Sequence, residues 1–113
     1  MAVVQDGALA YLIGDYNGAT EVLIYDLDAQ SWRVGPDFPY PVHHPMAAAL
    51  DGSVFVFGGY GNGWEESDAV WVLEGETLEW SEAAPMPSPL AAGGATTIDG
   101  KIHVVGGSLS GAV

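Results

Sequence analysis

A few side chains of this 113-residue chain are of the types that carry chemistry. Asp99, His103 and Ser108 supply the three residue types of a hydrolytic triad. However, Asp99 belongs to an Asp-Gly pair, which is typical of a hairpin turn, and His103 falls in an apolar run, where a histidine is usually packed in the core. The chain also contains no cysteine that could act as a nucleophile or as a metal ligand. We therefore expect no catalytic residue and no enzymatic activity.

Two adjacent histidines, His43 and His44, lie between Pro41 and Pro45. Neighbouring residues of an extended chain point in opposite directions, so the pair is a poor metal site. We expect it to lie in a surface loop, and we predict no metal site and no cofactor.

The stretch from Tyr60 to Glu66, Tyr-Gly-Asn-Gly-Trp-Glu-Glu, is the most suggestive of binding. An aromatic ring beside amides and carboxylates can stack on a sugar, and residues 15–18 repeat the pattern as Asp-Tyr-Asn-Gly. Tyr and Trp also anchor protein interfaces. Against both, Asn-Gly is an ordinary turn signal, and Trp64 could pack between sheets. The candidate ligand-binding residues are Tyr16, Asn17, Tyr60, Asn62, Trp64 and Glu65.

These residues are positioned by a sequence that repeats. Asp-Gly occurs at Asp6-Gly7, Asp51-Gly52 and Asp99-Gly100, and an apolar run that ends in glycine follows each pair. A second apolar run, a tryptophan and a proline-rich connection come next in the first two units. Each unit therefore predicts four short antiparallel strands, with Asp-Gly as the first hairpin turn because glycine supplies the positive φ.

The predicted strands differ in polarity. Leu9–Ile13 and Val54–Phe57 are apolar on both faces, which indicates that other sheets cover both. The fourth strands alternate apolar with polar residues, as a half-exposed outer strand would. We expect their tryptophans, Trp32 and Trp80, to pack each outer strand against the neighbouring sheet.

With this period and these glycines, the chain resembles kelch repeats, the four-stranded blades of a β-propeller. Residues 1–44 and 45–92 would form one blade each, and residues 93–113 the first two strands of a third. The chain departs from the family in three respects: Leu73-Glu74 replaces its usual Tyr-Asp, Gly14 stands alone where the family has a glycine pair, and no arginine follows the proline segment. The resemblance implies an all-β partial propeller. Its motif residues are Gly14, Gly58, Gly59, Gly106, Gly107, Trp32 and Trp80.

The charge of the chain is strongly one-sided. Fifteen Asp and Glu residues oppose only Arg33 and Lys101, which gives a formal net charge of −13. Nucleic acid and anionic membrane surfaces would repel such a chain. The acidic surface could bind a cationic partner or a divalent cation, or it could simply keep the chain soluble. No basic start with a long apolar stretch marks a signal peptide, so we expect a soluble chain and leave its compartment open.

Two and a half blades leave strand edges and apolar faces open to water. We therefore expect a homo-oligomer, in which the trailing half-blade of one chain is completed by the leading strands of another; a fragment of a larger propeller is the alternative. The expected function is a non-catalytic scaffold that binds protein through its rim loops. A lectin-like propeller, or a fragment of a larger kelch enzyme, remains open beside it.

Overall fold

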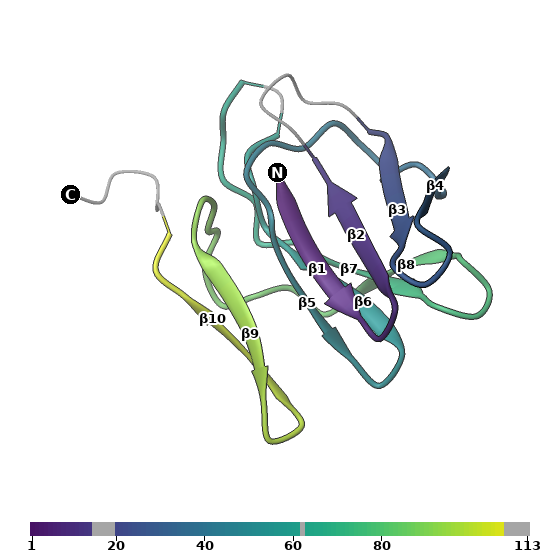
Figure 1. The fold of residues 1–113 in the computed structure, drawn as a ribbon. Coiled ribbons are helices and arrows are strands. Elements are labelled where there is room, and N and C mark those ends of the chain that lie inside the picture. The colour runs from purple at the N-terminus through teal and green to yellow at the C-terminus, as the bar shows by residue number, and fades with distance from the viewer. Residues whose placement is uncertain (15–19, 62, 108–113) are drawn as a thin grey trace.

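The computed structural model describes residues 1–14, 20–61 and 63–107, and within them the regular structure consists of β-strands without a helix (Figure 1). The strands are β1 Ala2–Asp6, β2 Leu9–Ile13, β3 Val22–Asp26, β4 Ser31–Val34, β5 Met46–Leu50, β6 Ser53–Phe57, β7 Val70–Glu74, β8 Trp80–Ala83, β9 Gly94–Ile98 and β10 Lys101–Val105.

The strands form two four-stranded antiparallel sheets and a two-stranded one. The orders are β1-β2-β3-β4 and β5-β6-β7-β8, with β9 and β10 as a separate pair. The first strands β1, β5 and β9 lie next to one another, so the three sheets are arranged around them (Figure 1). This is the arrangement of propeller blades, and it confirms the all-β fold of four-stranded antiparallel sheets.

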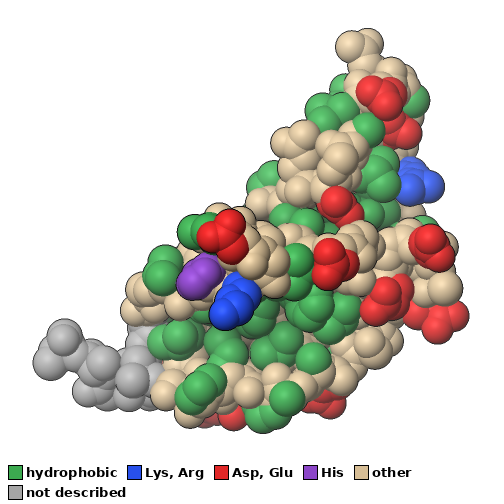
Figure 2. All heavy atoms as spheres, turned by 90° about the horizontal axis from the view of Figure 1, so that it is seen from below, with side chains coloured by type: hydrophobic (Ala, Val, Ile, Leu, Met, Phe, Trp, Pro, Cys, Tyr) green, Lys and Arg blue, Asp and Glu red, His purple; other side chains and the backbone are tan. Residues whose placement is uncertain are grey.

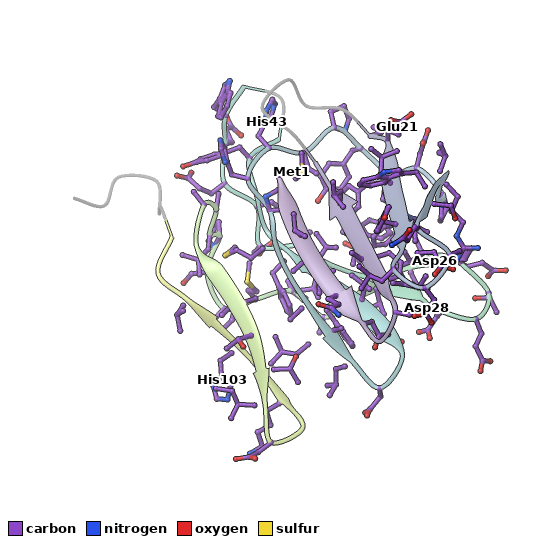
Figure 3. The ribbon with its side chains drawn as sticks, viewed as in Figure 1. Met1, Glu21, Asp26, Asp28, His43 and His103 are labelled. Carbon is purple, nitrogen blue, oxygen red and sulfur yellow. The ribbon has the colours of Figure 1, made fainter. Side chains whose placement is uncertain are left out.

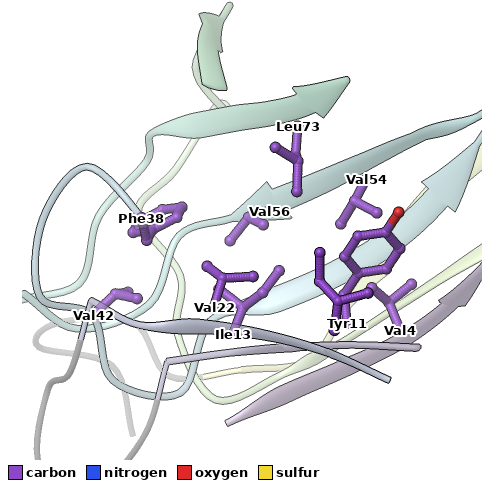
Figure 4. Packing of buried hydrophobic residues seen from close by; sticks show 10 residues of the cluster. Val4, Tyr11, Ile13, Val22, Phe38, Val42, Val54, Val56 and Leu73 are labelled. Carbon is purple, nitrogen blue, oxygen red and sulfur yellow. The ribbon is translucent and has the colours of Figure 1, made fainter. Parts of the chain in front are cut away.

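The core lies between the two complete sheets and on the connection that joins them (Figure 4). Alternate residues of each strand point into it, since successive side chains of a strand face opposite ways. Burying each large aliphatic side chain contributes roughly 1.5–3 kcal/mol. The members are Val4, Tyr11, Ile13, Val22 and Ile24 of the first sheet, Phe38 and Val42 of the connection, and Val54, Val56 and Leu73 of the second sheet.

The first hairpin turn of each unit falls on the Asp-Gly pair in the second and third units. In the first unit it lies one residue later. Asp51 and Gly52 have φ of 52° and 81°, and Asp99 and Gly100 have 51° and 74°, as a type I′ turn requires. In the first unit, Asp6 is the last residue of β1 and pairs with Leu9. The turn therefore falls on Gly7 and Ala8, with positive φ at Gly7 alone. The predicted Asp6-Gly7 turn is wrong by one position.

The two outer-strand tryptophans have different surroundings. Nε1 of Trp80 donates a hydrogen bond to the backbone oxygen of Pro36 at 3.0 Å, and its ring meets Phe38 edge-on with centroids 5.0 Å apart. Thus β8 packs on the connection that follows the first sheet. Trp32 is 57% exposed, and its ring contacts Tyr25 of its own sheet at 4.7 Å. The predicted contact with a neighbouring sheet is absent for Trp32, because no other described sheet lies against β4.

One face of the second sheet is open. Phe55 and Phe57 are only partly buried and, with Met86 and Ile102, line a groove of about 390 Å³ beside β10. Seen from below, the molecule has apolar side chains in the middle of its surface, with acidic ones around them (Figure 2). The prediction that β6 is covered on both faces is therefore wrong for the described chain.

Candidate functional site

The loops that could bind a partner gather along one edge of the sheets. In each complete sheet the second and fourth strands end at the edge where the first and third begin, because neighbouring strands are antiparallel. The β6–β7 loop, residues 58–69, and the connections 35–45 and 84–93 therefore meet at this edge, opposite the Asp-Gly turns (Figure 1). We call it the loop edge.

Backbone hydrogen bonds tie these segments together. His43 and Tyr60 exchange two, at 2.8 and 2.7 Å, so that the first connection pairs with the β6–β7 loop. On the other side of the loop, Gly59 donates to Leu90 at 2.9 Å and Leu90 donates to Ser67 at 3.1 Å. The loop edge is thus a small hydrogen-bonded network that joins successive units.

The glycines that follow β6 make this close approach possible. A Cβ on Gly58 would collide with the backbone oxygen of Leu90, and one on Gly59 would lie 2.7 Å from Cγ2 of Val42. Their φ values of 60° and 92° are in the left-handed region, which favours glycine. The other motif glycines, Gly14, Gly106 and Gly107, also have positive φ, of 74°, 70° and 93°.

Four rings form an aromatic cluster at the loop edge: His43, His44, Tyr60 and Trp64 (Figure 3 labels His43). Trp64 stacks on His43 with ring centroids 4.3 Å apart and planes inclined by 28°. The ring centroids of Tyr60 and His44 lie 5.4 and 6.1 Å from that of Trp64. Trp64 nevertheless remains 46% exposed, so part of its indole faces solvent.

The expectation that the two histidines lie in a surface loop is wrong. His43 is only 8% exposed, and His44 has φ of 47°, which breaks the extended geometry that would point the rings apart. Both rings consequently lie beside Trp64. The sequence did not predict that the histidines contact Trp64, because these residues belong to different units. The contact could have been expected from the topology, since the connection 35–45 and the β6–β7 loop lie at the same edge of the sheets.

Trp64 is held at the tip of a tight loop. Its N–H donates to the oxygen of Gly61 at 3.1 Å, and the N–H of Gly61 donates to the oxygen of Glu65 at 3.0 Å. Trp64 has φ of 61°, a conformation that costs a non-glycine residue on the order of 1–3 kcal/mol. Glu65 follows it with an exposed side chain. The loop therefore holds a large aromatic ring outward despite the strain.

Two further candidates, Asp99 and His103, lie on the β9–β10 hairpin and not at the loop edge. Tyr16, Asn17, Asn62 and Ser108 lie outside the described residues. Asp99 is in a turn, and His103 is exposed on β10, where it pairs with Thr96, so the expectation of a core histidine is wrong. The β9–β10 pair has no sheet over that face in the described chain, which accounts for the exposure.

No group of three or more His, Asp or Glu residues in the described segments could hold a metal ion. A resolved pKa shift is found at Tyr11 in the core, where burial raises the pKa, Asp6 adds to the rise and Arg33 opposes it. The described residues contain no helix that is long and apolar enough to cross a membrane.

Known proteins share this sequence pattern and this fold. A family model described as the kelch motif matches residues 41–87. Beta-scruin of Limulus polyphemus is 31% identical over 107 residues, covering 86% of this chain and 12% of that protein. Human Kelch-like protein 23 is 32% identical over 109 residues, covering 93% of this chain and 20% of that protein.

A solved structure, that of YjhT, superimposes with a TM-score of 0.83 over 97% of this chain and 38% of its own. At 20% identity it shows the fold alone. The chain thus spans a fifth or less of the length of these two curated relatives.

Proposed function

The chain belongs to the kelch-repeat family, and from that premise we propose that it is a protein-binding module that catalyses nothing itself and contacts its partner through the loop edge. Its relatives include scruins and Kelch-like proteins, and their similarity supports an interaction role. The chain spans only a small part of the length of these relatives. What a longer protein containing it would do is therefore also a proposal.

The observation that carries the proposal is that the Trp64 side chain is exposed while the segments around it are held by hydrogen bonds. Tryptophan and tyrosine are enriched among the residues that dominate binding energy at protein interfaces. Trp64 is 46% exposed, while His43 stacks beneath it and backbone hydrogen bonds fix the flanking segments. A ring that is already ordered loses little conformational entropy on binding, so it can anchor a partner efficiently.

The test compares two exposed tryptophans. The chain, as wild type, Trp64→Ala and Trp32→Ala, is immobilised and presented both with a protein and peptide library and with a glycan array. We expect protein binders that Trp64→Ala loses and Trp32→Ala keeps, since Trp32 lies on β4 and not at the loop edge. Circular dichroism of each variant checks that the β fold persists. Binding lost in Trp32→Ala and kept in Trp64→Ala would place the contact on the outer strand and overturn the proposal.

A carbohydrate-binding module is the second candidate, and the same residues favour it. Tyr60 and Trp64 offer ring faces on which a sugar could stack, and Glu65 offers an acceptor for hydroxyl groups. Reproducible sugar binding that is lost in Trp64→Ala, beside a blank protein library, would establish this function instead.

A further inference from the structure

We propose that the aromatic cluster recognises a cationic side chain, the arginine or lysine of a partner peptide. This inference rests on the proposed function, because it assigns a ligand class to the loop edge.

The rings provide the electron-rich surface that a cation prefers. A cation is attracted to the face of an aromatic ring when it lies within about 6 Å of the ring centroid, and tryptophan is the strongest partner. One side of the Trp64 indole stacks on His43 at 4.3 Å, and the ring of Tyr60 lies at 5.4 Å, inclined by 52°. A guanidinium or ammonium group over the exposed part of Trp64 would therefore meet two rings at once.

Carboxylates follow the tryptophan of the cluster in the sequence. Glu65 and Glu66 follow Trp64 directly, and Asp68 comes two residues later. Tyr60 and Glu66 form a backbone bridge, which holds the acidic stretch beside the rings. A planar guanidinium can stack on an aromatic face while its edge donates hydrogen bonds to carboxylates.

Lysine and arginine are absent from the segments that form the edge, where His43 and His44 are the basic residue types. Residues 35–69 contain no Lys or Arg, and Arg33 and Lys101 belong to β4 and β10. The view from below shows the Lys and Arg side chains on the face opposite the loop edge (Figure 2). With a net charge of −13, the field of the chain favours a cation and opposes an anionic peptide. A neutral sugar would gain nothing from this charge.

The tryptophans allow the site to be located by NMR. The chain has four tryptophans, Trp32, Trp64, Trp71 and Trp80, and each indole N–H group is expected to give one signal. The probe is the capped peptide Gly-Ser-Arg-Ser-Gly, with lysine, citrulline and glutamate in place of arginine as matched probes. Citrulline keeps the shape of arginine and removes its charge. We expect the arginine and lysine peptides to shift the Trp64 signal and leave the others in place.

Variants then separate the ring from the charge. Trp64→Leu should abolish the response, Trp64→Phe should keep part of it, and Trp32→Ala should keep all of it. The double variant Glu65→Gln, Glu66→Gln should weaken arginine binding several-fold, and so should added salt, because salt screens exposed charges. Unchanged signals of Trp71 and Trp80, which lie at the interface between the sheets, verify that each variant folds.

Three results would overturn the inference. Equal shifts from citrulline and arginine peptides would mean stacking without charge recognition, and a response to glutamate alone would invert the assigned sign. A silent Trp64 with every peptide would also reject the cationic ligand. In that case, a library binder lost in Trp64→Ala would still uphold the proposed function, so the two failures are distinguishable.

Discussion

Two partly buried indoles at the interface between the sheets, those of Trp71 and Trp80, differ in a polar contact. Nε1 of Trp80 donates to Pro36, whereas Nε1 of Trp71 is buried without a hydrogen-bond partner in the described structure. Both rings pack edge-on against Phe38. Replacing each by phenylalanine removes the same volume, so the difference between the two losses reports the hydrogen bond. We expect Trp80→Phe to lower the free energy of unfolding by about 1 kcal/mol more than Trp71→Phe, measured by urea denaturation. Equal losses would contradict this reading.

Tyr11 makes stability depend on alkaline pH. Burial, and secondarily Asp6, raises its pKa in the folded state above the ordinary value of 10.0, so the folded state holds the phenolic proton more tightly than the unfolded one. Its stabilising contribution is fully present below the unfolded pKa and is lost as pH rises through the folded pKa. Tyr11→Phe should therefore lose less stability than wild type between about pH 8 and about pH 11. Parallel urea titrations at both pH values measure this, and identical losses would exclude Tyr11 as the cause.

At the scale of elements, the strands were largely predictable and the loop edge was not. The predicted strand Leu9–Ile13 begins and ends as β2 does, and Val54–Phe57 differs from β6 by one residue at its start, because apolar runs and turn residues are local signals. The left-handed conformations of His44 and Trp64 have no such signal. His44 accepts a hydrogen bond from Ala92 of the next unit, and Trp64 is held within its own loop by its bond to Gly61. The two bonds between His43 and Tyr60 then bring these segments of different units together. The cluster therefore follows from packing between units, which the local pattern does not contain.

A side chain should be more destabilising at Gly58, directly after β6, than at Gly52, in the turn between β5 and β6. Gly58 and Gly52 both have positive φ, so an alanine is strained at either position. Only at Gly58 would the added Cβ also collide, with the backbone oxygen of Leu90; at Gly52 nothing lies within 4 Å. Gly58→Ala should accordingly cost at least about 1 kcal/mol more than Gly52→Ala in thermal or urea unfolding. A smaller loss at Gly58 would mean that the connection moves aside freely.

For the whole molecule, self-association remains a proposal, and the structure changes the form it would take. The leading strands β1 to β4 already make a complete sheet, so another copy has no spare strands for the half-blade β9–β10. Association would instead cover apolar surface such as the groove beside Ile102. We expect light scattering to give a mass above the 11.8 kDa monomer, rising with salt as repulsion is screened, and Ile102→Glu to reduce it. A monomer at every salt concentration would reject self-association.

The hydrogen bond from Trp80 to Pro36 gives the stacked sheets a direction. The donor lies on the fourth strand of one unit, and the acceptor lies on the connection that follows the unit before it. Trp32 presents its indole at the same place on β4, while residues 84–93 form the next connection. One end of the pair of sheets thus offers a donor and the other an acceptor-bearing segment. A contact of this kind joins the donor end of one pair of sheets to the acceptor end of the next, and repeating it around a common axis closes a ring. A two-fold dimer would instead place two donor ends, or two acceptor ends, against each other.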